Sequence, residues 1–180
     1  MAEKFDALTD KHIEFIEKQH VFFVGTAASE GLINVSPKGM DSLKVIDNST
    51  IIWLNLTGSG NETAAHVLEN DRMTIMFCSF EKQPLILRLY GQARAIYRRD
   101  ENWSEYFRHF KEYTGARQIF EVNLNMIQTS CGFAVPFYDF VSDRPVLEKW
   151  ADKKGKEGIQ EYWQEKNTIS LDGKDTGIFK

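Results

Sequence analysis

Several patterns that would fix a function class are missing from this sequence. The two cysteines, Cys78 and Cys131, stand far apart and form no CxxC motif. Such isolated residues are typical of reduced thiols in a cytosolic protein. Basic residues are not in excess, because 22 Lys and Arg stand against 26 Asp and Glu. This balance argues against nucleic acid as the main partner. The longest apolar runs, such as residues 21–24, are far too short to cross a bilayer.

Signals for targeting and for metal binding are also missing. The first ten residues, MAEKFDALTD, lack the basic stretch and apolar core of a secretory signal. The four histidines show no ligand spacing with one another or with the cysteines, so we predict no metal. No repeat, low-complexity tract or linker divides the 180 residues. We therefore expect one cytoplasmic domain over residues 1–180, with a C-terminal helix and tail at about 146–180.

Short apolar runs separated by turn residues dominate the rest of the chain. They predict strands over residues 20–28, 32–36, 43–46, 50–54, 72–80, 85–97 and 118–129, with a bulge or bend at Gly91. Helices are expected from Asp10, after Gly60, near Asn102 and over residues 146–166. The last of these is weak at residues 152–158, and the tail is expected to wrap over a partner or fray. Six or so strands with helices that do not alternate predict a mainly β fold, an antiparallel barrel with peripheral helices.

The segment WLNLTGSGNETAAHV, residues 53–67, carries the most chemical information. An apolar strand ends in a turn rich in Gly, Ser and Asn, and helix-forming residues follow at once. A helix that begins this way directs unpaired N–H groups and its positive dipole end at one point, which suits a phosphate. The competing interpretation is a capping box, in which Ser59 and Glu62 satisfy the helix end internally. The loop is neither a Walker motif nor a dinucleotide fingerprint.

A second candidate is Lys38, in the segment SPKG at residues 36–39. Pro37 ends the pairing of its strand, so Lys38 is held at a rigid strand end where its ammonium can meet a phosphate or a flavin carbonyl. The alternative is a solvated lysine in a turn. Arg88 and Arg94 share one strand face by spacing, and Arg88 is the better candidate for adding positive charge to a phosphate pocket.

Residues 131–140, CGFAVPFYDF, form a third feature, in which four aromatic side chains surround Pro136. Such a segment can wall a flat ring, or it can be core or subunit interface. We favour an interface, with part of it reaching a ligand. For Cys131 we expect a buried structural thiol rather than a nucleophile, since no histidine lies close in sequence.

The order of these segments resembles the pyridoxamine 5'-phosphate oxidase-like family of FMN-binding split barrels. The motifs that carry the resemblance are INVSPKG, IIWLNLTGSGNETAAHV, RMTIMFCSF, LRLYGQARAIY and CGFAVPFYDF. The resemblance implies a six-stranded antiparallel split β-barrel with flanking helices. It also implies a homodimer with two FMN molecules at the subunit interface.

The resemblance further implies which residues contact the flavin. Those implied at the isoalloxazine edge are Val35, Ser36, Pro37 and Lys38. Trp53 and Leu54 are implied near the ring and ribityl chain. The implied phosphate ligands are Ser59, Gly60, Asn61 and Thr63. The oxidases proper carry an Arg-Lys pair where Gly60 and Asn61 stand here, and an arginine where Ile33 stands. Backbone amides and Lys38 would therefore carry more of the phosphate charge.

Three functional hypotheses follow. The first is an FMN-dependent oxidoreductase that moves hydride or electrons between a reduced nicotinamide, or another small donor, and a small-molecule acceptor. No residue stands out as a catalytic acid or base, and the chemistry would belong to the flavin. The second is a non-catalytic flavin-binding protein that stores or senses its cofactor. The third is a dimeric scaffold in which Ser59 and Glu62 only cap a helix.

Overall fold

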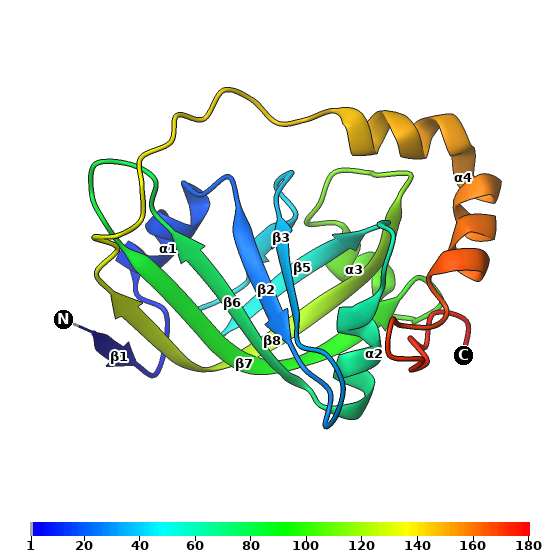
Figure 1. The fold of residues 1–180 in the computed structure, drawn as a ribbon, viewed down its shortest axis with the longest axis horizontal. Coiled ribbons are helices and arrows are strands. Elements are labelled where there is room, and N and C mark those ends of the chain that lie inside the picture. Colours follow the sequence, from blue (N-terminus) through cyan, green and yellow to red (C-terminus); the bar gives the residue numbers. More distant parts are fainter. Residues whose placement is uncertain (1) are drawn as a thin grey trace.

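One curled antiparallel sheet of eight strands is the framework of the molecule (Figure 1). The computed structural model describes residues 2–180. The strands are β1 (Glu3–Phe5), β2 (Phe22–Thr26), β3 (Asn34–Lys38), β4 (Leu43–Val45), β5 (Thr50–Leu56), β6 (Arg72–Cys78), β7 (Ile86–Tyr97) and β8 (Ala116–Ser130). Their order is β3-β2-β6-β7-β8-β5-β4, and β1 pairs with β8. The predicted mainly β, split-barrel class is confirmed, with eight strands in place of six.

Local turn chemistry explains the hairpins. The Asp47 carboxylate accepts the Ser49 amide at 2.8 Å, which closes the turn between β4 and β5. At the predicted bend, Tyr90 pairs with Met126 but Gly91 pairs with Leu124, so Asn125 is an extra residue in β8. The irregularity expected at Gly91 is therefore present, with its additional residue on the neighbouring strand.

Four helices lie around the sheet: α1 (Asp10–Glu17), α2 (Glu62–Glu69), α3 (Trp103–Phe107) and α4 (Val146–Lys166). The cap of α1 is Thr9, whose hydroxyl accepts the His12 amide, and Asp10 is the first helical residue instead of the cap. In α4 the weakness predicted at residues 152–158 is present as a kink at Gly155, whose φ of 67° favours glycine.

The main core fills the concave side of the sheet. It holds side chains from β2, β5, β6, β7 and β8 together with Ile16 of α1 and Ala64 and Val67 of α2. A second cluster covers the opposite side of β5 and β8, where Leu54 and Ile119 pack against α3. The two clusters make β5 buried on both sides, which explains its continuous apolar sequence.

The C-terminal tail packs against the rest of the chain, so the alternative that it frays is wrong. Residues 167–180, the C-terminal strap, fold back beside α2 and the end of β7 (Figure 1). Asn167, Thr176 and Ile178 of the strap are buried. The strap bends at Gly173 and Gly177, whose φ values of 74° and 71° glycine adopts readily.

Residues 131–145 cross from β8 to α4 without helix or strand (Figure 1). Phe133 and Phe137 are largely exposed there, while Phe140 stacks on His20 with ring centroids 3.6 Å apart. Cys131 is exposed, so the expected buried thiol is wrong for this residue; Cys78 is the buried one. Cys131 follows the last residue of β8, where the chain leaves the sheet, and no helix or strand of residues 2–180 covers it.

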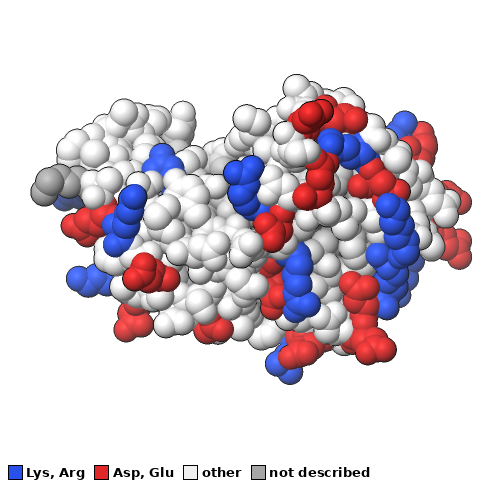
Figure 2. Space-filling view, turned by 90° about the horizontal axis from the view of Figure 1, so that it is seen from below, with Lys and Arg blue, Asp and Glu red and all other residues white. Residues whose placement is uncertain are grey.

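Charges of both signs are interspersed over the surface seen in Figure 2. Lys and Arg do not gather into a stripe on that face, in keeping with the near balance of acidic and basic residues. None of the helices in residues 2–180 has the length and apolar content needed to span a membrane.

Candidate functional site

A pocket of about 590 Å³ lies where β3, the glycine loop (residues 57–61), α2, the start of β8 and the strap meet. Its size is within the range of small-molecule sites. The side chains and backbone that line it come from widely separated parts of the chain. They are Asn34, Ser36, Lys38, Asn55, Leu56, Gly58, Ser59, Gly60, Asn61, Glu62, Thr63, Arg117, Lys166, Ile169, Ser170 and Leu171.

β3 presents one of its two faces to the pocket. Side chains alternate along a strand, so Asn34, Ser36 and Lys38 share this face. The Asn34 amide donates to the Thr63 hydroxyl at 3.1 Å and ties β3 to the first turn of α2. The Ser36 hydroxyl donates to the side-chain oxygen (Oδ1) of Asn34 at 3.0 Å. The Lys38 ammonium lies 5.2 Å from the centre of the Trp53 ring, a cation–π contact.

Arg117 enters the pocket because of a β-bulge. Asn55 of β5 pairs with Gln118, but the next residue, Leu56, pairs with Ala116. Arg117 is therefore the extra residue on β8, and a bulge re-aims the side chain that it carries. Its Nη1 donates to the Gly60 carbonyl at 2.9 Å and to the Asn167 side-chain oxygen at 2.7 Å.

Three cations line this pocket, and Lys166 is the one paired with a carboxylate, that of Glu165 at 2.7 Å. No ion pair within 4.0 Å joins Lys38 or Arg117 to an acid in residues 2–180. Burial lowers the pKa of Lys38 to about 8, and the nearby charge of Arg117 lowers it too. Burial also lowers the pKa of Arg117, whose Nε is buried without a hydrogen-bond partner in the described chain. Two desolvated cations side by side form a site that favours an anion.

The start of α2 adds backbone donors. Asn61 is the cap residue, its side chain makes no capping hydrogen bond, and the capping box of Ser59 with Glu62 is absent. Glu62 instead uses its Oε2 to accept the Leu171 amide of the strap at 2.9 Å. Within residues 2–180, no acceptor takes the amide protons of Glu62 and Thr63. Free amides at a helix N-terminus attract negative charge.

The sequence-predicted residues divide between the pocket and other places. Those that line it are Ser36, Lys38, Ser59, Gly60, Asn61 and Thr63. Val35 and Pro37 are exposed on the other face of β3. Trp53 and Leu54 are completely buried, Trp53 in the main core and Leu54 under α3. Arg88 lies away from the pocket on β7, where it donates to the Ser130 hydroxyl at 3.0 Å. The role of each in binding stays a prediction.

Sequence reasoning missed Arg117, Asn55 and the strap. Arg117 is the second residue of β8 and is 57 positions from the loop carbonyl that it contacts, so no local spacing links the two. The available signal was two adjacent polar residues, an arginine and a glutamine, at the beginning of β8. Both side chains are buried, Arg117 at 3% exposure and Gln118 at 0%. The Gln118 amide donates to the Asn61 side chain at 2.6 Å.

Comparison with known proteins identifies similar sequences and folds. The family described as "Pyridoxamine 5'-phosphate oxidase" matches residues 8–131. The pyridoxamine 5'-phosphate oxidase family protein ustO of Aspergillus flavus is 36% identical over 187 residues, which cover 94% of this chain and 75% of that protein. The structure of HupZ from Group A Streptococcus has a TM-score of 0.53 at 20% identity, over 67% of this chain and 91% of that one. A putative pyridoxamine 5'-phosphate oxidase from Lactobacillus delbrueckii has a TM-score of 0.55 at 15% identity, over 68% and 94%.

Proposed function

We propose, since this chain belongs to the pyridoxamine 5'-phosphate oxidase family, that it is an FMN-dependent oxidoreductase whose glycine-loop pocket holds the FMN phosphate. The reaction class is transfer of hydride or electrons between a reduced nicotinamide, or another small donor, and a small-molecule acceptor. The resemblance of the loop and of β3 to the flavin-binding split barrels supports FMN as the cofactor.

The observation that carries the proposal is a pair of cations without a carboxylate partner in residues 2–180, the buried Arg117 and the half-buried Lys38. Lys38 and Arg117 line one pocket, and the Nε of Arg117 has no partner in residues 2–180. A phosphate dianion fits this donor set, because it offers oxygens both to a guanidinium and to the free amides at the start of α2. The single carboxylate among the lining residues, Glu62, is engaged by the Leu171 amide of the strap.

Each residue has a distinct task in this proposal. Arg117 supplies a planar group of donors, and Lys38 supplies a point charge at the end of β3. Asn34 and Ser36 fix the strand end against α2 through their hydrogen bonds. The bound flavin would supply the redox chemistry, while the protein orients it and sets the charge around it.

This chain lacks the Arg-Lys pair that the oxidases proper carry in the phosphate loop, and Arg117 supplies a positive charge beside the loop in its place. Gly60 and Asn61 carry no charge, but the Gly60 carbonyl fixes the Arg117 guanidinium at 2.9 Å. A cation from β8 thus stands beside the loop, where the oxidases proper carry cations within it. This replacement supports phosphate binding in a chain that lacks the loop cations.

The second part of the proposal is a homodimer with the flavin at the subunit interface. The exposed aromatic side chains of residues 131–140, Phe133 and Phe137 above all, support it because large exposed apolar surfaces mark interaction sites. Light scattering coupled to size-exclusion chromatography should give twice the chain mass of 20.8 kDa. A monomeric mass at micromolar concentration would contradict the dimer.

A non-catalytic flavin-binding protein is the alternative function. It is favoured by the lining of the pocket. Among the described residues that line it, Glu62 is the only Asp, Glu or His, and its carboxylate accepts the Leu171 amide of the strap. Anaerobic addition of reduced nicotinamide separates the two functions. Bleaching of bound flavin at a useful rate indicates an oxidoreductase, and unchanged absorbance indicates storage or sensing.

The test of the proposed function is a binding titration with FMN and with riboflavin, which lacks the phosphate. The wild-type protein should bind FMN at least tenfold more tightly than riboflavin. Lys38→Gln should remove most of this preference, whereas Lys82→Gln, which changes an exposed lysine in the turn between β6 and β7, should keep it. Equal affinity of the wild-type protein for the two flavins, or no binding of either, would refute phosphate binding at this site.

A further inference from the structure

Asn167 contacts three parts of the chain that are far apart in sequence: the glycine loop, the start of β8 and the C-terminal strap. It ends α4, begins the C-terminal strap and is completely buried. Its side-chain oxygen accepts from Arg117 at 2.7 Å, and its side-chain nitrogen donates to the Gly58 carbonyl at 3.1 Å. One amide side chain therefore touches both the buried cation and the glycine loop.

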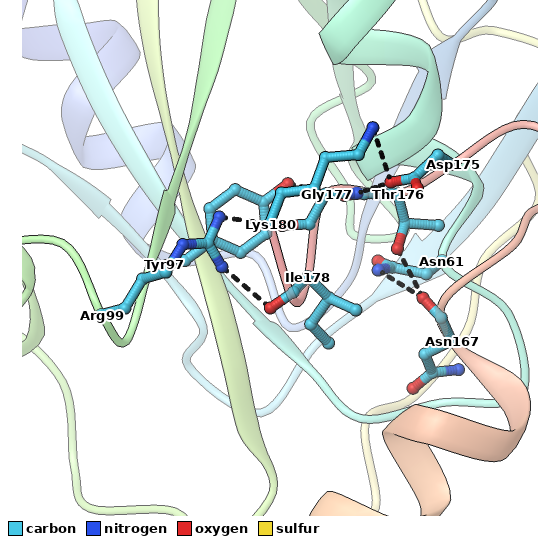
Figure 3. Close-up of polar contacts among 9 residues, drawn as sticks. All are labelled: Asn61, Tyr97, Arg99, Asn167, Asp175, Thr176, Gly177, Ile178 and Lys180. Carbon is cyan, nitrogen blue, oxygen red and sulfur yellow. Dashed lines mark hydrogen bonds and ion pairs between the residues drawn. The ribbon is translucent and has the colours of Figure 1, made fainter.

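The backbone carbonyl of Asn167 is held as firmly as its side chain. It accepts from the Thr176 hydroxyl at 2.6 Å and from the Asn61 side chain at 3.3 Å (Figure 3). Four of its polar contacts thus join the loop, Arg117 and the strap to one residue, and its backbone amide donates to the Trp163 carbonyl of α4 at 2.9 Å. Because Asn167 is the first residue of the strap, a movement of the strap would break its hydrogen bonds with Arg117 and with the Gly58 carbonyl.

The strap is in turn fastened to β7. The Tyr97 hydroxyl donates to the Thr176 carbonyl at 2.6 Å, and the Arg99 guanidinium donates to the carbonyls of Gly177 and Ile178, each at 2.8 Å (Figure 3). These bonds hold the strap by its backbone, so they fix its path whatever side chains it carries. The path places Thr176 where its hydroxyl meets Asn167.

We propose that Asn167 is a positioning residue for the anion site, and that the C-terminal strap sets the affinity of the pocket through it. This inference rests on the proposed function, because it assigns to Asn167 the orientation of the group that meets the ligand phosphate. Arg117 is the residue that contacts the ligand, and Asn167 acts through Arg117 and through the loop.

Two physical consequences of its contacts support this role. A guanidinium with one nitrogen bound to a fixed oxygen loses little further freedom when it binds a phosphate, so the affinity is higher. The peptide bond is planar and trans, so holding the carbonyls of Gly58 and Gly60 also fixes the directions of the Ser59 and Asn61 amides. Both effects prepare donors before the ligand arrives.

The choice of an amide at this position is also informative. A carboxylate in the place of Asn167 would stand at 2.7 Å from Arg117 and would neutralise the charge that the ligand needs. An amide oxygen orients the guanidinium and leaves its charge available. Asp at position 167 would also lose the donor that the Gly58 carbonyl accepts, so we expect it to weaken phosphate binding and to lower stability.

The experiment compares Asn167→Asp with the matched control Asn123→Asp. Asn123 is exposed on β8, six residues and roughly 20 Å along the strand from Arg117, so it adds the same charge far from the pocket. For each protein, FMN and riboflavin affinities and the melting temperature are measured. Asn167→Asp should weaken FMN binding at least tenfold and leave riboflavin binding within twofold. Its melting temperature should fall, because the new carboxylate cannot donate to the Gly58 carbonyl. The control should keep all three values.

A second pair of variants tests the strap itself. Thr176→Val removes the hydroxyl that holds the Asn167 carbonyl, and Thr176→Ser keeps it. The valine variant should lose FMN affinity selectively over riboflavin, and the serine variant should retain it. The inference is overturned if both ligands weaken equally. A wild-type protein that does not prefer FMN over riboflavin overturns the proposed function, whereas a wild-type preference that Asn167→Asp retains overturns only the role of Asn167.

Discussion

The affinity for FMN relative to riboflavin should fall as the pH rises above about 8, because Lys38 loses its proton there. Burial holds the pKa of the Lys38 ammonium at about 8 in the free protein. If only the charged form binds the phosphate strongly, about one molecule in eleven is competent at pH 9. The FMN dissociation constant should therefore rise about tenfold between the plateau below pH 8 and pH 9.

The stability of the protein without ligand should change in the opposite direction. The pKa of Lys38 is about 8 in the folded chain and 10.5 as its ordinary value. Between these two values the unfolded chain carries a proton that the folded chain has released, so the free energy of unfolding increases with pH in this window. Affinity that falls while stability rises separates titration of Lys38 from general alkaline unfolding.

Lys38→Arg provides the control. A guanidinium stays protonated throughout this range, so the variant should bind FMN with little change from pH 7 to pH 9. The assay is a fluorescence titration of both flavins at each pH, and the ratio of the two constants cancels any ionisation of the ring. A ratio that is constant in the wild-type protein from pH 7 to pH 9 would refute the assignment of Lys38 to the phosphate. An identical fall in Lys38→Arg would do the same.

Two further predictions concern the framework of the pocket. Gly91→Ala should lower the free energy of unfolding by about 2–3 kcal/mol in urea denaturation, because its Cβ would clash with the backbone carbonyl oxygen of Asn123. A wild-type midpoint would contradict the bulge geometry. Thr57→Val should cost about 2 kcal/mol, because its hydroxyl accepts from Trp163 Nε1 and donates to the Gly115 carbonyl, both at 2.8 Å. Thr57→Ser should recover most of this loss, and equal losses for the two variants would contradict the hydrogen-bond account.

The strand framework could be predicted because its signals are local. Residues 51–54 of β5 are all apolar because both sides of the strand are covered. The bulge at Gly91 and the kink at Gly155 each coincide with a glycine. β1 was missed because three residues, two of them charged, carry no detectable alternation. The packing of the C-terminal tail against β7 and α2 was missed for another reason. Its burial depends on Tyr97 and Arg99, whose contacts with it lie 78–79 positions away in sequence.

The site was predictable where it is formed by one segment and not where it is formed by several. The glycine loop and Lys38 stand next to strand ends that the sequence marks clearly. Arg117 could not be placed, because its direction depends on a one-residue shift between β5 and β8 that no composition signal reports. Arg88 was favoured instead on strand spacing alone, which gives the face of a strand but not the distance to the loop.

The glycine loop also shows how one sequence pattern can serve two purposes and how packing decides between them. Ser59 and Glu62 have the spacing of a capping box, and in that arrangement the helix end would satisfy its own donors. Here the Glu62 carboxylate instead accepts the Leu171 amide of the strap at 2.9 Å. The N-cap residue of α2 makes no side-chain capping hydrogen bond in residues 2–180. The amides of Glu62 and Thr63 thus remain free of acceptors in residues 2–180, in the pocket that Lys38 and Arg117 line. A segment more than a hundred residues away in sequence therefore determines that this helix end can receive an anion.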